Sequence, residues 1–185
     1  MATVSFAFYT GLGAAEPLIN RLTAWFTGRH MHVEIVFHQP TGAHVACGVW
    51  AGETTFMRPK TFGKSCWEWR SVAVTRAQEA AIRRFCAAQA QAKVPFSRWA
   101  MARALTPFPR PTDGRTWFCS ELCVAAMQAA GLLVDEVASA TTPSGLWTML
   151  TSLGAYAAAS PLLERRISKA GELRCKPAWF GGSAR

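Results

Sequence analysis

The stretch that decides the fold is residues 31–37, MHVEIVF, a compact run rich in β-branched side chains. Such a run predicts a strand, on which successive side chains point to opposite faces. His32 and Glu34 then share one face, and the apolar residues that alternate with them share the other, where they anchor the strand to a core. Taken alone, this pattern favours a strand that turns its polar face to water.

Working outward from this strand, the first half of the chain shows strand patterns and the second half shows helix patterns. A turn at residues 40–42 leads to a returning strand at residues 44–50, so the two strands form a hairpin. Another strand is expected at residues 4–9, and a further strand pair near residues 54–57 and 67–74. Helices are expected at residues 16–27, 76–92, 98–105, 119–130 and 143–150.

This order of elements argues for an α+β domain. The helix at residues 76–92 has a clear start, because Thr75 and Gln78 match a capping box. No repeat and no linker divides the chain, so we expect a single domain over residues 1–163 followed by a basic extension at residues 164–185. With 185 residues, 50% of them hydrophobic and only 17% charged, the chain is not disordered and buries a core of its own.

The N-terminus lacks the basic and apolar regions of a signal peptide, so we expect a cytoplasmic or virion-associated protein. The stretch 137–163 carries no charge, but Pro and Gly interrupt it, and a bilayer-spanning helix needs about 20 predominantly apolar residues. We therefore expect two short packed helices and no transmembrane segment, with membrane contact as the lesser alternative.

The formal net charge of +9 is concentrated in residues 58–110, which hold eleven basic and two acidic side chains. An acidic partner, such as nucleic acid, an anionic membrane or an anionic wall polymer, therefore has to be considered. The chain has no run of five basic residues and no regular interleaving of basic and aromatic residues, so it does not resemble a nucleic-acid platform. We expect a solvated basic face that offers residues 58–110 to an anionic partner.

The six cysteines are expected to be reduced thiols, because the chain is not short and several of them lie in apolar runs. No Cys-Xaa-Xaa-Cys pair is present, and Cys119 and Cys123, one helical turn apart, have no nearby His to complete a metal site. We expect neither a metal nor another cofactor.

A candidate nucleophile lies in residues 117–124, WFCSELCV, where Cys119 falls at or near the first turn of a helix. A thiol there lies close to the positive end of the helix dipole and to unpaired N–H groups, which favours the thiolate. The same N–H groups stabilise an oxyanion. Cys123, one turn further on, is a weaker candidate, and the alternative for Cys119 is that it is simply buried.

A cysteine nucleophile needs a base, and the base needs a group that orients it. His32 is the candidate base. The orienting group is either Glu34 on the same strand or His44 on the next one. His30 and His38 are less suitable, because His30 precedes the strand and His38 lies near the turn.

These segments resemble the circularly permuted NlpC-like branch of the papain-fold thiol hydrolases, in which the His strand precedes the Cys helix. The matching stretches are HVEIV at residues 32–36, FCSEL at residues 118–122 and TPSGLW at residues 142–147, the last being similar to a Ser-Pro-Xaa-Xaa-Leu stretch of the family. The resemblance spans residues 3–152 and implies an antiparallel sheet packed against helices. Residues 94–97, VPFS, depart from the family, because many members have a Tyr-Asp there. Members of this family occur in bacteria and in tailed bacteriophages, so the resemblance is compatible with either origin.

By this resemblance, Cys119 is the nucleophile and His32 its base, and His44 is similar in placement to the second His of lecithin:retinol acyltransferase-like members. The resemblance implies a thioacyl intermediate and a substrate with an amide or ester bond. The function expected first is a cysteine peptidase or amidase, with peptidoglycan peptides among its substrates. The alternatives are a lipid-acting acyltransferase or phospholipase of the same fold, and a non-enzymatic structural virion protein that retains the fold.

Overall fold

The computed structural model describes residues 1–10, 28–63, 66–104, 106 and 111–155. The expected helix at residues 16–27 lies outside the described residues. So do the end of the expected domain, from residue 156, and the basic extension that begins at residue 164.

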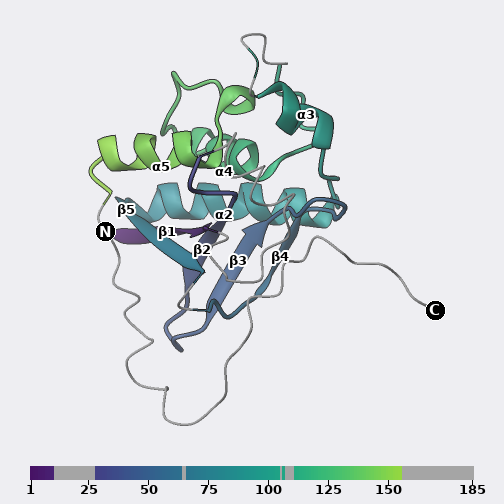
Figure 1. The fold of residues 1–185 in the computed structure, drawn as a ribbon. Coiled ribbons are helices and arrows are strands. Elements are labelled where there is room, and N and C mark those ends of the chain that lie inside the picture. Colours follow the sequence, from purple (N-terminus) through teal and green to yellow (C-terminus); the bar gives the residue numbers. More distant parts are fainter. Residues whose placement is uncertain (11–27, 64–65, 105, 107–110, 156–185) are drawn as a thin grey trace, which may run out of the picture.

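The chain forms a five-stranded antiparallel sheet with the strand order β4-β3-β2-β1-β5, which places β2 at its centre (Figure 1). The α+β class expected from the sequence is confirmed. The strands are β1 (Ala2–Tyr9), β2 (His32–His38), β3 (His44–Gly48), β4 (Phe56–Pro59) and β5 (Trp67–Val74).

The expected pairing of the last two strands is wrong. β4 pairs with β3 and β5 pairs with β1, so the two strands lie at opposite edges of the sheet. The reason is that β2 uses one edge of β1, and the other edge is free to take β5 along its whole length, from Ala2 opposite Val74 to Tyr9 opposite Trp67.

Helices cover one face of the sheet (Figure 1). On this face Val33, Ile35 and Phe37 of β2 are fully buried in one core with Ile82, Leu122 and Leu146 of three different helices. The helical elements are α2 (Arg76–Gln91), α3 (Arg98–Arg103), α4 (Cys119–Gln128), the short 3₁₀ helix η1 (Ala138–Ala140) and α5 (Pro143–Ser152).

The helix ends follow local sequence signals. The Thr75 hydroxyl accepts from the Gln78 N–H at 3.1 Å and the Gln78 side chain accepts from the Thr75 N–H at 2.9 Å, which confirms the expected capping box of α2. At the start of α5, the Thr142 hydroxyl accepts from the Gly145 N–H. Gly131, just beyond α4, has φ +72°, a left-handed conformation that glycine adopts without strain.

The polar face of β2 is not turned to water, so the expectation drawn from its alternation alone is wrong. His32 is 4% exposed and Glu34 is 0% exposed. Aromatic side chains from other parts of the chain cover this face, where Phe62, Trp67 and Trp69 pack around a small core that includes Val36.

Among the described cysteines, Cys66 departs from the expectation of reduced thiols, because it is disulfide-bonded. The sequence pattern could not show this, since a disulfide depends on which cysteines meet in space. The free cysteines among the described residues are Cys47, Cys86, Cys119 and Cys123.

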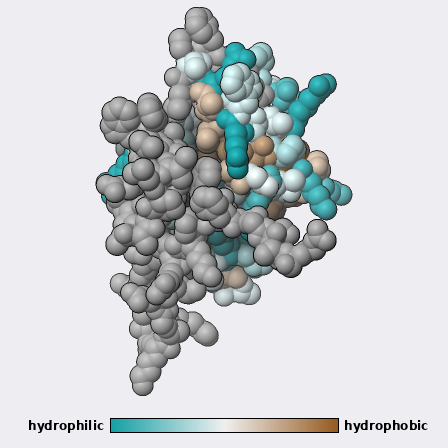
Figure 2. Space-filling view, turned by 45° about the vertical axis from the view of Figure 1, so that its right-hand side comes forward, coloured by the Kyte–Doolittle hydropathy of each residue, from teal (hydrophilic) through white to brown (hydrophobic). Residues whose placement is uncertain are grey.

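In the described part of the chain, no helix is long and apolar enough to cross a membrane. The described part of the uncharged stretch at residues 137–163 forms the two short helices η1 and α5. The molecular surface in Figure 2 mixes hydrophobic patches with hydrophilic side chains where it is not covered by grey atoms. Among the residues that the structure describes, the most exposed aromatic side chain is Trp99 of α3, at 71%.

Some basic side chains of residues 58–110 bind other side chains of the protein and are not free for an external partner. The Arg70 guanidinium lies 3.7 Å from the ring centre of Trp147, and that of Arg83 lies 4.3 Å from the ring centre of Phe37 and binds Glu79. In these cation–π contacts the positive charge stabilises the fold itself.

Candidate active site

Cys119 is the first residue of α4, as expected. Phe118 before it is extended, and its N–H donates to the Glu121 side chain at 3.4 Å. The Ser120 hydroxyl donates to the Thr141 carbonyl at 2.7 Å and so ties the helix start to the segment before α5. The first N–H groups of a helix have no partner within the helix, and those of α4 begin at Cys119 itself.

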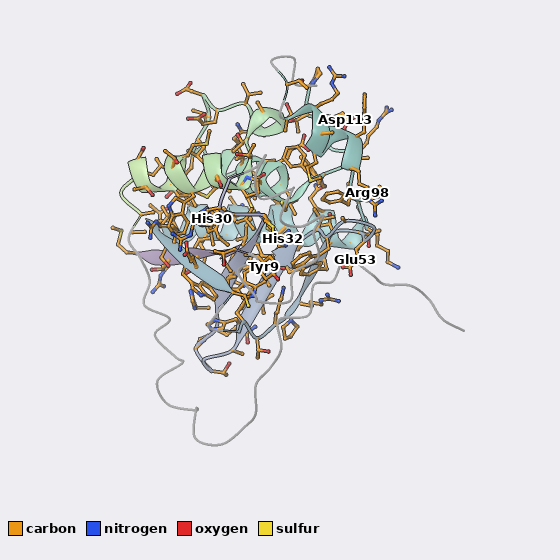
Figure 3. All side chains as sticks on the ribbon, viewed as in Figure 1. Tyr9, His30, His32, Glu53, Arg98 and Asp113 are labelled. Atoms are coloured by element: carbon orange, nitrogen blue, oxygen red, sulfur yellow. The ribbon has the colours of Figure 1, made fainter. Side chains whose placement is uncertain are left out.

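His32, the first residue of β2, meets Cys119 across the fold. Burial by itself lowers the pKa of His32, but a hydrogen bond and charge interaction with Cys119, together with those of Glu34, outweigh it and raise the pKa above its usual value. Figure 3 shows His32 where the sheet meets the helices above it. The structure therefore brings the candidate nucleophile and the candidate base together.

Glu34 completes the group from the same strand. Its Oε1 lies 3.1 Å from Nε2 of His32 and 2.5 Å from Nζ of Lys60. Burial by itself raises the pKa of Glu34, but His32 and Lys60 outweigh it and lower the pKa below its usual value. Glu34 is therefore a buried carboxylate, and its second oxygen, Oε2, has no hydrogen-bond partner.

This arrangement suits nucleophilic catalysis. Because Nε2 of His32 is engaged by Glu34, Nδ1 is the ring nitrogen left for the thiol. A proton that moves from Cys119 to His32 leaves a thiolate beside an imidazolium, and the carboxylate of Glu34 stabilises the imidazolium. N–H groups at a helix start that carries the nucleophile are suited to stabilise an oxyanion next to the sulfur.

Two indole rings fix the imidazole. The ring of His32 stacks on Trp50 with centroids 3.6 Å apart, and Trp67 meets it edge-on at 6.2 Å. Packing of this kind restricts rotation of the ring, so His32 keeps the orientation that serves both of its partners.

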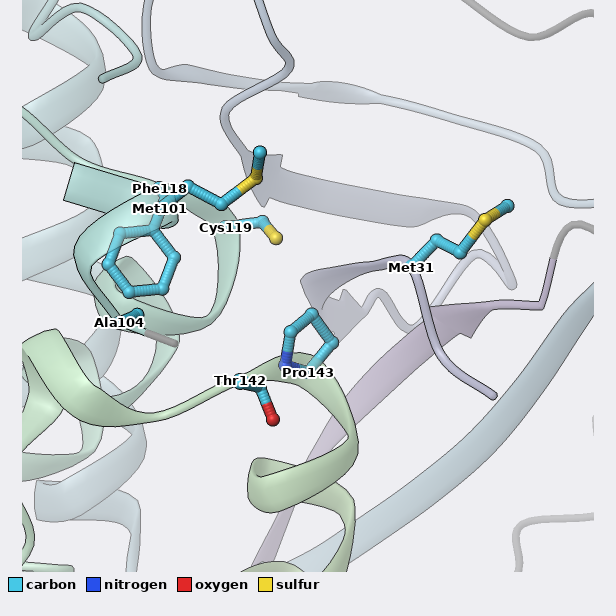
Figure 4. A pocket seen from close by; sticks show the side chains of 7 residues that line it. All are labelled: Met31, Met101, Ala104, Phe118, Cys119, Thr142 and Pro143. Carbon is cyan, nitrogen blue, oxygen red and sulfur yellow. The ribbon is translucent and has the colours of Figure 1, made fainter. Parts of the chain in front are cut away.

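An apolar pocket opens beside the thiol (Figure 4). The Cys119 sulfur points into the space between Met31 and Pro143. The pocket walls come from the chain before β2, from α3 and from the start of α5. The lining residues are Met31, Met101, Ala104, Phe118, Cys119, Thr142 and Pro143.

His44, the other candidate for the orienting position, is not brought to this group. It lies opposite His38, six residues along β2 from His32, a separation of about 20 Å at the rise of an extended strand. Cys123 is fully buried, and burial raises the pKa of its thiol well above the usual value, so it remains the weaker candidate.

The two remaining histidines take part in other contacts. His38 Nε2 lies 2.6 Å from the Ser5 hydroxyl. His30 Nε2 lies 3.0 Å from Glu68, and the ring of His30 stacks on Trp147.

Sequence reasoning missed Lys60 and Trp50. The hairpin register contains a signal for Trp50, because Ile35 lies opposite Cys47 and the same register continued puts Trp50 opposite His32. No local pattern marks Lys60, which follows β4 and reaches Glu34 only through the folding of the sheet.

Among the described residues, no three His, Cys, Asp or Glu side chains are grouped so as to hold a metal ion. The chain matches no family model, and comparisons with curated proteins and with solved structures found no match.

Proposed function

We propose that this protein is a cysteine hydrolase that cleaves an amide or peptide bond through a Cys119 thioacyl intermediate. The observation that supports it is the buried group of Cys119, His32 and Glu34, in which Glu34 contacts one nitrogen of the imidazole and Cys119 raises its pKa. The resemblance of the His strand and the Cys helix to permuted NlpC-like thiol hydrolases supports the same reaction.

In this reaction the Cys119 sulfur forms a bond to the substrate carbonyl carbon, and the N–H groups at the start of α4 stabilise the oxyanion. The C–N bond breaks, and the His32 imidazolium gives its proton to the leaving amine. His32 then takes a proton from water, which attacks the thioester, releases the acid and restores the thiol. Glu34 remains ionised throughout.

The test is to screen the full chain against acyl substrates, including peptidoglycan stem peptides and activated esters, and to trap the thioacyl enzyme by acid quench and mass spectrometry. Wild-type protein is expected to carry the acyl group on Cys119. Cys119→Ala and His32→Ala are expected to lose at least about a thousandfold in turnover. Turnover that survives in Cys119→Ala would refute the proposal, and no acylation of the wild type by any substrate would favour a structural virion role.

A second candidate, a lipid-acting acyltransferase or phospholipase, is favoured by one specific observation. Apart from Thr142, the small pocket beside the Cys119 sulfur is lined by apolar and sulfur-containing side chains, so the part of a substrate next to the thiol is expected to be uncharged, as the first carbons of an acyl chain are. A preference for long-chain acyl esters over peptide amides, together with binding to anionic lipid vesicles, would separate this candidate from the first. In either case the basic stretch 58–110 offers a contact for an anionic partner.

A further inference from the structure

Lys60, the residue after β4, provides the second positive charge at the buried carboxylate. Its Nζ lies 2.5 Å from Glu34 Oε1, the same oxygen that His32 contacts. The backbone N–H of Lys60 donates to the His44 carbonyl at 3.1 Å, so the residue is also tied to the sheet. Its side chain is only 22% exposed, and the ammonium therefore faces the protein interior more than the solvent.

Aromatic rings surround the ammonium group of Lys60. Its Nζ lies 4.7 Å from the ring centre of Trp67, and the rings of Trp50, Phe62 and Phe56 lie at 5.2, 5.0 and 6.0 Å. Each ring attracts a cation placed over its face, and together they restrict where the ammonium can move. Two of these rings, Trp50 and Trp67, also pack against His32, so the same side chains position both the ammonium and the imidazole.

The site needs this charge for an electrostatic reason. In the thiolate–imidazolium state, Cys119 and Glu34 are negative and His32 alone is positive, which leaves one uncompensated negative charge in a buried site. Burying an unpaired charge is costly, and a carboxyl group avoids that cost by taking up a proton. The ammonium of Lys60 makes the group neutral overall, so it permits Glu34 to stay ionised.

Within the part of the chain that the structure describes, the charged groups that act on Glu34 are His32 from its own strand and Lys60 from the segment after β4. From α4, the remaining titratable neighbour is Cys123, and burial raises the pKa of its thiol well above the usual value, so it stays neutral. On the β3 side, Gly48 approaches Glu34 so closely that a Cβ there would lie 2.9 Å from Glu34 Cγ.

We propose that Lys60 is a positioning residue of the catalytic group, whose ammonium keeps Glu34 ionised and aimed at His32 so that the thiolate–imidazolium pair of Cys119 and His32 forms. This inference rests on the proposed function, because it assigns Lys60 a part in the same site. Lys60 acts through Glu34 and makes no bond to the substrate. Its removal therefore affects the protonation of the base and leaves the pocket unchanged.

The experiment compares Lys60→Met and Lys60→Gln, which remove the charge, with Lys60→Arg, which keeps it. Arg58→Met is the matched control, because Arg58 is a basic residue on the neighbouring strand β4 that packs on Phe56 and does not act on Glu34. Two readouts are independent of the natural substrate. The first is the rate of Cys119 alkylation by iodoacetamide at several pH values, followed by peptide mass spectrometry. The second is the titration of His32 by NMR.

Lys60→Met and Lys60→Gln are expected to lower the midpoint of the His32 titration and to slow Cys119 alkylation at mildly acidic pH by about tenfold or more. Lys60→Arg is expected to restore most of the rate, and Arg58→Met to match the wild type. In the Glu34→Gln background, Lys60→Met is expected to cause no further loss, because the partner through which it acts is already neutral.

Two outcomes would overturn the inference. One is a wild-type His32 titration and alkylation profile in folded Lys60→Met or Lys60→Gln. The other is an equal loss from Lys60→Met with and without the Glu34→Gln substitution, which would mean that Lys60 acts independently of Glu34. Failure of the proposed function is a separate result, since it shows as acyl turnover that persists in Cys119→Ala. If the Met variant does not fold, the Gln and Arg variants still decide the question, because both keep a long side chain with a polar end among the rings.

Discussion

The imidazole of His32 lies flat against the indole of Trp50, with ring centroids 3.6 Å apart and an interplanar angle of 23°. Glu34 contacts Nε2 at the edge of the same imidazole. One partner fixes the plane of the ring and the other fixes its rotation within that plane. The candidate base is therefore already oriented without a substrate, which the proposed proton transfer requires.

Trp50→Ala is expected to lower kcat by about tenfold or more, because the imidazole loses the surface that sets its plane. KM should change little, since Trp50 is not among the residues that line the pocket. Steady-state kinetics on an activated acyl ester would check this. Trp50→Phe, which keeps an aromatic face, should recover part of the lost kcat, and a KM effect without a kcat effect would argue against the orienting role.

Glu34→Gln should move the alkaline limb of the pH–rate profile to lower pH. Glu34 helps to raise the pKa of His32, so the wild-type imidazolium persists to higher pH than an isolated histidine would. A neutral amide removes that support, and the proton is lost earlier as the pH rises. The limb belongs to the coupled Cys119–His32 pair, so it should be measured by kinetics and by NMR titration together. An unchanged limb would mean that Glu34 does not act on the base.

Gly48→Ala is expected to displace the Glu34 side chain. The new methyl group would lie 2.9 Å from Glu34 Cγ and 3.3 Å from Phe56 Cζ, so the carboxylate has to move. Overpacking of this kind costs about 1–3 kcal/mol of unfolding free energy. The free energy of unfolding, measured with urea, and kcat should both fall. A variant with wild-type kcat would show that the position of the carboxylate is not critical.

His44→Ala should leave turnover unchanged, because the register places His44 opposite His38 and far along the sheet from His32. The comparison with Glu34→Gln, measured as kcat/KM on the same substrate, tests which of the two residues orients the base. A loss in His44→Ala as large as that in Glu34→Gln would contradict the assignment drawn from the structure.

Ala104→Phe is expected to fill the pocket beside the thiol, because Ala104 lines it from the end of α3. The contacts of His32 and Glu34 are not touched. KM for substrates with a bulky acyl group should rise by about tenfold, while small acyl groups are affected less. A series of esters of increasing acyl length would measure this, and equal effects on all lengths would show that the pocket does not hold the acyl group.

Much of this architecture could be predicted from local patterns. The period-2 alternation of residues 31–37 identified the central strand, and Thr75 with Gln78 fixed the start of α2. The same alternation placed His32 and Glu34 side by side. The start of α4 at Cys119 also agrees with the expected helix. These features depend on residues that are close in the sequence.

What could not be predicted depends on contacts between distant segments. The alternation of β2 contains no information about Phe62 and Trp69. These side chains cover the polar face of β2, so that this face is buried in a second core cluster. The choice between Glu34 and His44 required the hairpin register, which composition does not determine. Lys60 could not be recognised because its role exists only once β4 lies beside β3.

The reacting group and one side of the pocket wall come from different parts of the chain. Cys119, His32 and Glu34 lie at the start of α4 and on the central strand, whereas Met101, Ala104, Thr142 and Pro143 line the pocket from α3 and the start of α5. Substitution of Met101, Ala104 or Pro143 is therefore expected to change what fits beside the thiol while the reacting group stays in place. For directed evolution, this means that libraries confined to the wall should retain chemistry in most members and diverge in selectivity.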